Sequence, residues 1–353
     1  MGKKKTILVA PLNWGLGHAT RCIPIIQELL KNNFNVIIAS DGIALKILQK
    51  EFPTLDYITL PSYGISYPKK GKLLKWKLFL KLPSIKKAIS LEKNIIQKLV
   101  SENKIHGIIS DNRFGVRNSN IPSVYITHQL KVLSGNTSFL TSKIHQNIIN
   151  KFNECWVPDL EGENNLSGDL SKNIKLKTPI KFIGPLSRFK KENVKKKYDI
   201  LILLSGPEPQ RSILESKLFY QFKDESKEII FVLGIVEQKQ KVTKLSSNTI
   251  YNFMLANELE TAINESNLVI ARSGYSTIMD LAILEKKAFF IPTPGQFEQE
   301  YLANYFQKKK WAPYCNQEDF SKDKIEKSIN YQGFKLKDTN TNFRDLFSLF
   351  KSK

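Results

Sequence analysis

The hydrophobic residues in the first part of the chain alternate between short continuous runs and stretches with helical spacing. An apolar run covers 6–11, apolar positions recur at helical intervals over 19–31, and a second run covers 35–40. Short continuous runs are typical of strands buried on both faces, as in a parallel sheet. Strands that alternate with helices predict a doubly wound parallel α/β sheet. Further strands of this sheet are predicted at 56–60, 105–110 and 123–127.

The same alternation begins again after a segment with the composition of a linker. Residues 182–186 include Gly184 and Pro185, and basic residues follow as far as Lys197. A chain of 353 residues is long enough for two hydrophobic cores. We therefore predict two Rossmann-like doubly wound domains that face a cleft, one at 1–184 and one at 185–335. Strands of the second domain are predicted at 199–204, 228–233, 267–271 and 288–291.

The last residues of the chain form a separate amphipathic stretch. Within 336–353, apolar residues recur at helical spacing, among them Phe343, Leu346, Phe347 and Phe350. An apolar helix face needs a surface to pack against. We therefore predict a C-terminal helix that packs back on the N-terminal domain.

Composition limits the class of protein. Hydrophobic residues make up 41% of the chain and charged residues 25%, as in ordinary globular proteins, and no apolar run has the length of a membrane span. The three cysteines, Cys22, Cys155 and Cys315, lie far apart, which argues against a disulfide framework or zinc site and favours the cytoplasm. The 54 Lys+Arg against 33 Asp+Glu give a net charge of +21, which favours anionic partners. A lysine-rich composition throughout the chain explains this total equally well.

A glycine-marked turn with a histidine follows the first predicted strand. Its sequence includes Gly15, Gly17 and His18, and it leads into the first predicted helix. A dinucleotide fingerprint requires a third glycine where this chain has Thr20, although Asp41 ends the second strand where a ribose-binding acid belongs. A dehydrogenase therefore stays an alternative. An imidazole at this edge of the sheet can take a proton from a hydroxyl near neutral pH, or it can simply cap the turn.

Two further polar residues follow buried strands of the first domain. Asp111 comes after 108–110 and His128 after 124–127. Because the carboxyl ends of parallel strands converge, we expect Asp111 to approach His18, fix its tautomer and stabilise its protonated form. The alternative is that both residues serve caps or loops. An acceptor is expected at the same edge, on Gly15, Gly17, Asn112 and His128.

The other two histidines lack a comparable setting. His106 and His145 do not follow a predicted strand at its carboxyl end. We expect both at the surface.

The second domain carries a site of a different kind. Hydroxyl-rich residues 273–277 fall at a predicted helix N-terminus, where side chains and backbone N–H groups bind phosphate. Asp280 lies one turn further on, where it can accept hydrogen bonds from ribose, and a rigid loop at 292–296 precedes residues suited to sugar hydroxyls. Helix capping and a solvated loop are the alternatives. The donor residues predicted from this pattern are Gly206, Arg211, Ser273, Gly274, Ser276, Thr277, Asp280, Gln296, Glu298 and Gln299.

These motifs resemble the GT-B glycosyltransferases of the family 28 type, and the resemblance spans most of the chain. It is most specific over 272–277 with Asp280 and in the proline-rich loop with Gln299 and Asn304. The family includes the bacterial enzyme that adds N-acetylglucosamine to the undecaprenyl-linked peptidoglycan precursor. The chain departs from the family pattern at Leu16, where glycine is usual, and at Asp280, where glutamate is usual.

The resemblance implies roles for several of these residues. In the family, the segment that corresponds to 272–280 and the proline-rich loop binds a UDP-sugar, and an acid at the position of Asp280 holds the ribose. Residues 251–254 would then lie against the uracil ring, which adds Phe253 and Met254 to the donor site. In the family the histidine of the N-terminal glycine loop, here His18, is the usual candidate base.

The mechanism expected from these parts is direct displacement with inversion. His18, assisted by Asp111, removes the proton of the acceptor hydroxyl, which attacks the anomeric carbon. The dipole of a helix N-terminus stabilises the diphosphate leaving group. The sequence contains no Asp-x-Asp pair, so neither a metal nor a cofactor is expected, and the UDP-sugar is a substrate. The alternatives are a UDP-sugar 2-epimerase, which requires converging carboxylates such as Asp111, Glu208 and Glu298, and a non-enzymatic polyanion binder.

A basic and apolar segment suggests where the acceptor is found. Between Lys69 and Lys98, lysines interleave with bulky apolar residues, among which Trp76 and Phe79 are candidate interface anchors. This pattern is typical of segments that bind an anionic membrane, although a solvated basic helix has the same composition. We predict a glycan or lipid acceptor, a peripheral position on the cytoplasmic face of the inner membrane, and no nucleic-acid partner.

Overall fold

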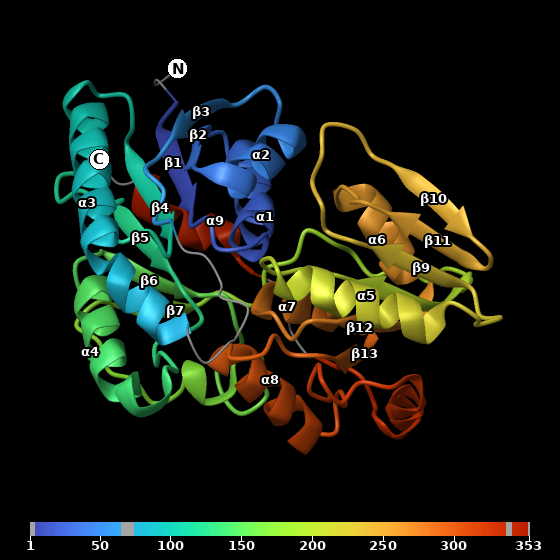
Figure 1. Cartoon of the computed structure of the whole chain (residues 1–353). Coiled ribbons are helices and arrows are strands. Elements are labelled where there is room, and N and C mark those ends of the chain that lie inside the picture. Colours follow the sequence, from blue (N-terminus) through green and yellow to red (C-terminus); the bar gives the residue numbers. More distant parts are fainter. Residues whose placement is uncertain (1–3, 65–73, 337–340, 352–353) are drawn as a thin grey trace. The chain divides into compact units, whose positions relative to one another are not determined.

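The computed structural model describes residues 4–64, 74–336 and 341–351, and it divides into two compact units (Figure 1). Unit 1 comprises Met1–Ile65, Leu78–Leu186 and Thr339–Lys353, and unit 2 comprises Ser66–Lys77 and Ser187–Asp338. Each unit is built on its own, mainly parallel sheet. The predicted fold class, with two Rossmann-like α/β domains, is confirmed.

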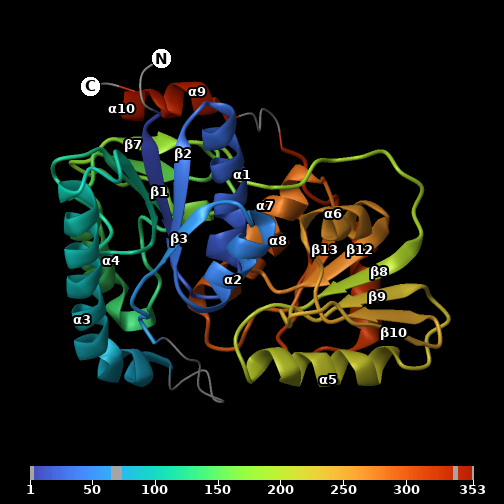
Figure 2. The ribbon, with the colours of Figure 1, turned by 90° about the horizontal axis from the view of Figure 1, so that it is seen from above.

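Unit 1 contains a seven-stranded parallel sheet in the order β3-β2-β1-β4-β5-β6-β7. In both views α1 and α2 cover one face of this sheet, while α3 and α4 lie on the other (Figures 1 and 2). The strands are β1 (Thr6–Pro11), β2 (Asn35–Ser40), β3 (Asp56–Thr59), β4 (Gly107–Asp111), β5 (Ser123–Ile126), β6 (Glu154–Val157) and β7 (Ile180–Phe182). The helices are α1 (Gly17–Lys31), α2 (Gly42–Glu51), α3 (Leu74–Ser101), α4 (Ser138–Ile149), α9 (Phe343–Leu346) and α10 (Ser348–Lys351), with short 3-10 turns η2 (Gly135–Thr137) and η3 (Gly168–Leu170).

The core of unit 1 explains why its central strands are uniformly apolar. Leu8 and Ala10 of β1 pack in one cluster with Ile96 of α3, and all three are fully buried. Their neighbours Ile7 and Val9 are also fully buried and point to the opposite face, because side chains alternate along a strand. A strand with both faces covered in this way shows no polar alternation in the sequence.

The C-terminal residues pack on unit 1 through aromatic side chains. Phe347 lies 6.0 Å from Phe34 between ring centroids and 6.3 Å from Trp156. Phe350 approaches Gly107 so closely that a Cβ there would lie 2.5 Å from its ring. A glycine is therefore required at this point of β4 for α10 to dock.

Unit 2 contains a six-stranded sheet in the order β10-β11-β9-β8-β12-β13, in which only the β10–β11 pair is antiparallel. Its core gathers apolar residues from β8, β9, β12 and β13 with α5. The strands are β8 (Tyr198–Leu203), β9 (Ile229–Val232), β10 (Val242–Leu245), β11 (Asn248–Tyr251), β12 (Ser266–Ala271) and β13 (Lys287–Phe290). The helices are α5 (Gln210–Phe222), α6 (Ala256–Asn264), α7 (Tyr275–Ile283) and α8 (Phe297–Lys308), followed by the 3-10 segment η4 (Lys322–Asn330).

Four strands of the structure are missing from the sequence-based prediction: β6, β7, β10 and β11. Phe182, which the sequence placed in a linker, ends β7. β7 has only three residues, and every residue of β10 is exposed, so neither produces a run of buried apolar positions. Within the described ranges, no helix combines the length and the apolar character needed to cross a membrane.

Candidate active site

The carboxyl edge of the unit 1 sheet collects the polar residues that the sequence singled out. Asp111 is the last residue of β4 and is fully buried. His18 stands in the first turn of α1, directly after the loop that follows β1. His128 lies two residues beyond β5 and is buried. The parallel topology thus brings together residues that are about 90 to 110 positions apart in the chain.

His18 and Asp111 form a close pair, as the sequence predicted. Nδ1 of His18 lies 2.8 Å from Oδ1 of Asp111. A third residue, Arg21, completes the group: its Nε donates to Oδ2 of Asp111 at 2.6 Å, and its Nη2 contacts Oδ1 of the same carboxylate. Nη2 of Arg21 also lies 2.9 Å from Nδ1 of His18. The site is therefore a His–Asp–Arg cluster, in which the sequence analysis missed the arginine.

The protonation states in this cluster follow from burial and charge. Burial would raise the pKa of Asp111, but the Arg21 guanidinium and the His18 ring outweigh it and hold this pKa well below its usual range. Burial lowers the pKa of His18; Asp111 opposes this effect, whereas Arg21 and His128 add to it. At neutral pH the cluster therefore contains an ionised carboxylate and a neutral imidazole.

An ionised carboxylate fixes the histidine tautomer. Asp111 can only accept hydrogen bonds, so we assign the proton to Nδ1 of His18, 2.8 Å from Oδ1, although Nη2 of Arg21 approaches the same nitrogen. Nε2 then holds a lone pair. The His18 side chain retains 17% exposure, whereas Asp111 has none, so the imidazole is the part of the pair that a substrate can reach. Chemically, the pair can accept a proton at Nε2 and stabilise the resulting imidazolium.

A partly buried chain of hydrogen bonds adjoins Asp111. Asn112 lies with its Nδ2 3.4 Å from Oδ1 of Asp111 and accepts a bond from the Tyr125 hydroxyl at 2.9 Å. That hydroxyl lies 3.0 Å from Nε2 of His145. Burial lowers the pKa of His145 to about 4, so this ring is neutral at neutral pH. Asn112, which is a candidate for acceptor contact, therefore also donates a hydrogen bond to Asp111.

The expected surface position is wrong for His145, whereas His106 keeps part of its surface exposed. His145 is buried because it lies on the face of α4 that turns toward β5, where it contacts the ring of Tyr125. His106 is half-buried, and its Nδ1 accepts a hydrogen bond from the backbone N–H of Thr6 at the start of β1. Spacing along the sequence could not show either contact, since both partners are distant in the chain.

The glycine turn before α1 has the conformation that its residues suggest. Gly15 has φ +79°, in the left-handed region that favours glycine, and Gly17 is the first residue of the helix.

Nδ1 of His128 lies 3.3 Å from Nη1 of Arg21, so His128 belongs to the same cluster. The structure therefore gathers His18, Asp111, Asn112 and His128 at one edge, with the turn alongside. Acceptor binding by these residues stays a prediction.

A second buried ion cluster accounts for Asp41. Its carboxylate pairs with Nη2 of Arg113 and accepts a bond from Nδ2 of Asn13 at 3.1 Å. Arg113 also donates to Glu92 at 2.7 Å and has no exposed side-chain surface. The acid that a dehydrogenase would use for ribose is thus occupied within the fold, which counts against that alternative. Sequence analysis missed Arg113 because the hydropathy of an arginine gives no sign of burial.

In unit 2, a buried arginine organises the loops around the predicted donor site. Arg272 follows β12 and is 1% exposed. It donates to Gln210 at the start of α5 and to Gln317, and also to two consecutive carbonyl groups after β13, those of Ile291 and Pro292. These bonds fix three loops to one another. The sequence analysis quoted Arg272 only as part of a motif, and the structure gives it a positioning role.

Two residues predicted to bind the donor have side-chain atoms that are used within the fold. The Ser273 hydroxyl donates to the carbonyl of Gln299 at 2.7 Å, and Oε1 of Gln299 accepts the backbone N–H of Thr293 at 2.8 Å. These atoms hold the loop between β13 and α8 in place. The half-buried residues Ser276 and Thr277 lie in the first turn of α7, which has Gly274 as its N-cap, and backbone N–H groups there are suited to an anion.

Asp280 is held by the start of unit 2. The hydroxyl of Ser187 donates to Oδ1 of Asp280 at 2.6 Å. Burial raises the pKa of Asp280 to about 6, against the opposing effects of Arg188 and of the Ser187 bond. This carboxylate is thus poised to change its protonation state near neutral pH.

Arg211, predicted to bind the donor, is already paired. Its guanidinium donates to Glu208 at 2.7 Å and contacts Glu215, so two carboxylates compensate its charge. Glu208 also accepts from the Ser212 hydroxyl at 2.7 Å, which leaves it ill suited to the epimerase alternative. Gly206, two residues before Glu208, is exposed and has φ +104°. A Cβ at this position would lie 3.9 Å from Oγ1 of Thr293.

The remaining predicted donor residues lie just after β11 and at the start of α8. Phe253 is buried just after β11, and its N–H donates to Oδ1 of Asn252 at 3.0 Å, while Met254 is half-buried. Gln296 is the N-cap of α8, and Glu298 follows in its first turn. Nothing in these contacts conflicts with a donor role, which stays a prediction for all four.

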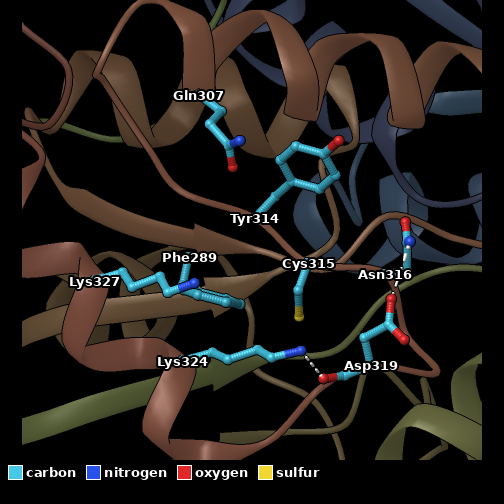
Figure 3. A pocket seen from close by; sticks show the side chains of 8 residues that line it. All are labelled: Phe289, Gln307, Tyr314, Cys315, Asn316, Asp319, Lys324 and Lys327. Atoms are coloured by element: carbon cyan, nitrogen blue, oxygen red, sulfur yellow. Dashed lines mark hydrogen bonds between the residues drawn. The ribbon is translucent and has the colours of Figure 1, made fainter.

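A cavity of about 310 Å³ in unit 2 contains none of the predicted donor residues (Figure 3). Its polar groups bond to one another: Lys324 donates to the carbonyl of Asp319, and Nδ2 of Asn316 lies 3.1 Å from Oδ2 of Asp319. Burial raises the pKa of the Cys315 thiol, which points into the cavity, to about 11. The cavity therefore offers neither a reactive thiol nor the anion site at α7.

Comparison with known proteins agrees with this geometry. Residues 210–344 match the model of the glycosyltransferase family 28 C-terminal domain. The chain is 23% identical over 339 residues to the UDP-N-acetylglucosamine–N-acetylmuramyl-(pentapeptide) pyrophosphoryl-undecaprenol N-acetylglucosamine transferase of Haemophilus ducreyi, with 92% of this chain and 88% of the relative covered. It is 29% identical to the enzyme of that name from Prochlorococcus marinus, over 40% of each chain.

Solved structures share the fold of the whole chain. Arabidopsis thaliana UGT89C1, crystallised with UDP-L-rhamnose, has a TM-score of 0.62 at 12% identity, with 99% of each chain covered. MurG of Acinetobacter baumannii has a TM-score of 0.51 at 14% identity, with 94% of this chain and 93% of that chain covered.

The comparisons define a class for the fold and for one domain: the chain has the fold of the GT-B glycosyltransferases, and residues 210–344 match the glycosyltransferase family 28 C-terminal domain. Within that class, its second unit carries a family 28 C-terminal domain, and the chain as a whole resembles the MurG-like nucleotide-sugar transferases. The family resemblance inferred from the sequence motifs is confirmed.

Proposed function

We propose that the protein is an inverting, metal-independent transferase that moves a hexose or N-acetylhexosamine from a UDP-sugar to an acceptor hydroxyl. The observation that carries the proposal is the 2.8 Å contact between Nδ1 of His18 and Oδ1 of Asp111, from which we assign the proton to Nδ1 and a lone pair to Nε2. This is the arrangement that a general base requires. It occurs in a chain whose second unit belongs to a domain family of glycosyltransferases.

Each unit supplies one half of the reaction. In unit 1, Nε2 of His18 takes the proton of the acceptor hydroxyl, and Asp111 stabilises the imidazolium that forms. The hydroxyl oxygen attacks the anomeric carbon, and the bond from that carbon to the diphosphate breaks, which inverts the configuration. In unit 2, the N-terminus of α7 stabilises the charge that develops on the UDP leaving group.

The proposal is tested by following a labelled sugar. Radiolabelled UDP-N-acetylglucosamine, UDP-glucose and UDP-galactose are each incubated with the protein, EDTA and a total lipid extract from bacterial membranes, and label is counted in the organic phase. We expect transfer from at least one donor, with UDP released in equal amount. The proposal would be contradicted if none of the three donors released UDP and none transferred its label to the organic phase.

Asp280 provides a specific test of the donor site. We propose that its carboxylate accepts hydrogen bonds from the ribose hydroxyls, so Asp280→Ala should weaken UDP binding by about 1–3 kcal/mol. Because the ionised form is the better acceptor and its pKa is about 6, UDP affinity should fall as the pH drops through about 6. Asp280→Asn should lose this pH dependence. Calorimetric titration with UDP at pH 5 and pH 8 measures both effects.

The matched control for this test is Glu285→Gln. Glu285 is an exposed carboxylate just after α7 that pairs with Lys191 at the surface. Its replacement should leave UDP affinity unchanged. Wild-type affinity in Asp280→Ala would remove Asp280 from the donor site.

We further propose that the acceptor is lipid-linked and that unit 1 binds an anionic membrane. Three apolar side chains of α4 are strongly exposed: Phe139 at 79%, Leu140 at 60% and Ile144 at 53%. Lys143 lies beside them, 5.3 Å from the centroid of the Phe139 ring. A surface that combines exposed apolar and basic groups suits the boundary between lipid headgroups and acyl chains.

The neighbouring helix α3 adds positive charge on the same side of the sheet (Figures 1 and 2). Its described lysines, Lys81, Lys86, Lys87, Lys93 and Lys98, are exposed. The first part of the predicted basic segment, 69–73, and the side chains of Trp76 and Phe79 lie outside the described part of the chain. Support for the membrane surface therefore comes from α4 and from the later turns of α3.

Vesicle sedimentation tests this surface. The protein should bind vesicles that contain phosphatidylglycerol and remain in solution with pure phosphatidylcholine. Lys86→Gln with Lys87→Gln should weaken binding by about 2 kcal/mol, since each lysine near an anionic leaflet contributes about 1 kcal/mol. Adding Phe139→Ser and Leu140→Ser to these two lysine changes should weaken vesicle binding further. Tyr220→Ser, at a 69% exposed aromatic residue of unit 2, serves as the control. Equal binding by all variants would exclude this surface.

A further inference from the structure

Arg21 has no role in the mechanism described so far, although it contacts each charged or titratable side chain of the cluster around His18. Its side chain is 2% exposed. We propose that Arg21 is a positioning residue that compensates the charge of Asp111 and so keeps His18 in its neutral, proton-accepting form. This inference rests on the proposed role of His18 as the base.

The contacts of Arg21 fix the carboxylate in one orientation. Nε donates to Oδ2 of Asp111 and Nη2 contacts Oδ1, which is the two-point geometry by which a guanidinium grips a carboxylate. Nη1 is turned toward Nδ1 of His128 at 3.3 Å. Since Asp111 cannot rotate in this grip, Oδ1 stays 2.8 Å from Nδ1 of His18 and holds the ring in place.

The charge of Arg21 also acts on His18 directly. An isolated histidine–carboxylate pair favours the imidazolium, because the negative charge has no other partner. In this cluster the guanidinium nitrogen Nη2 lies 2.9 Å from Nδ1 of His18, as close as the carboxylate oxygen does. The two charges therefore largely cancel at the imidazole.

The other groups near His18 do not reverse this balance. The groups that face the ring are Asp111 from β4, Arg21 from the same helix, and His128 from the segment after β5. The Cys22 thiol faces Asp111 at 3.7 Å, and burial together with Asp111 raises its pKa well above the usual value, so it stays neutral. Burial of His18 acts in the same direction as Arg21, since both lower the pKa of the ring.

The consequence is a base that is ready over a wide pH range. A histidine in an uncompensated pair would be protonated at mildly acidic pH and could not accept the proton of the acceptor. With Arg21 in place, the fraction of unprotonated His18 stays high as the pH falls. The His18 ring loses some affinity for a proton as a result. Asp111 remains in contact with the ring and stabilises the imidazolium during transfer.

An NMR titration of the histidine rings tests this inference without any need for turnover. In the wild type, the ¹⁵N shifts of His18 should report a neutral ring with the proton on Nδ1 at pH 7. In Arg21→Met the titration midpoint of His18 should rise by about one to two pH units, as expected for the loss of one nearby cation. Arg21→Lys keeps the charge and should move the midpoint by less than half as much. Lys31→Met, at an exposed residue of the same helix, should not move it.

The outcomes separate this inference from the proposed function. An unchanged midpoint in a folded Arg21→Met protein, or an equal rise in Arg21→Lys, would overturn it. If Arg21→Met does not fold, the Arg21→Gln and Arg21→Lys pair gives the same comparison. The acid limb of the kcat/KM profile should move with the midpoint wherever transfer is observed. A rise in the midpoint without transfer from any UDP-sugar would support Arg21 as described while contradicting the proposed reaction.

Discussion

His18→Ala is expected to reduce the rate of glycosyl transfer by about 10²–10⁴-fold, the range that a general base contributes. The acceptor hydroxyl would lose the group that we propose takes its proton. Of the remaining members of the cluster, Asp111 is gripped by Arg21, and Nδ1 of His128 lies against the same guanidinium. UDP affinity should stay within about two-fold of wild type, since the residues that we assign to UDP lie in unit 2. Steady-state kinetics and calorimetry with UDP measure the two quantities.

The control for this variant is His106→Ala. His106 is also a half-buried histidine of unit 1, but it lies before β4, at the opposite end of that strand from Asp111. Its loss should lower stability slightly and leave the rate per folded molecule unchanged. Equal losses of UDP affinity and of transfer in His18→Ala would contradict the role of His18 as the base.

Arg113→Met is expected to lower the free energy of unfolding by about 3–5 kcal/mol, the cost of leaving buried charges without their partner. Arg113 is fully buried between Asp41 and Glu92, and it also donates to the carbonyl groups of Pro11 and Pro61. Burial already raises the pKa of Glu92 despite the presence of Arg113. Without the arginine, both carboxylates would have to take up protons or admit water. Thermal and urea unfolding followed by circular dichroism measure the change.

Two companion variants make this prediction specific. Arg344→Met removes an exposed arginine of unit 1 and should change stability by less than about 0.5 kcal/mol. Removing the charged partners together, with Asp41→Asn and Glu92→Gln added to Arg113→Met, should recover part of the loss, because no uncompensated charge then remains. A loss below about 1 kcal/mol for Arg113→Met alone would show that this cluster does not stabilise unit 1.

The sequence predicts the central strands well because burial on both faces leaves an unmistakable pattern. β1 and β2 have the predicted bounds, and every residue of β4 and β5 is buried. β10 could not be found in this way, since it is an exposed strand whose position depends on pairing with β11. β7 is too short to produce a periodic signal.

The same contrast holds for the candidate site. His18 and Asp111 could be predicted because they lie at or just beyond the carboxyl ends of strands in one parallel sheet, whose topology brings strand ends together. Arg21, Arg113 and Arg272 could not, because an arginine in a sequence is normally solvent-exposed, and only the positions of its partners reveal its burial. All three are fully or almost fully buried here and hold loops or carboxylates in place. Positioning residues of this kind depend on tertiary contacts that no local pattern encodes.

The central claim, that the chain binds a UDP-sugar without a metal, is tested most directly by calorimetric titration of the purified protein in EDTA. The ligands are UDP, UDP-N-acetylglucosamine, UDP-glucose, GDP-mannose and NAD. We predict saturable binding of UDP and of at least one UDP-sugar, with no binding of GDP-mannose or NAD. Binding of NAD, or of none of the five ligands, would contradict the account.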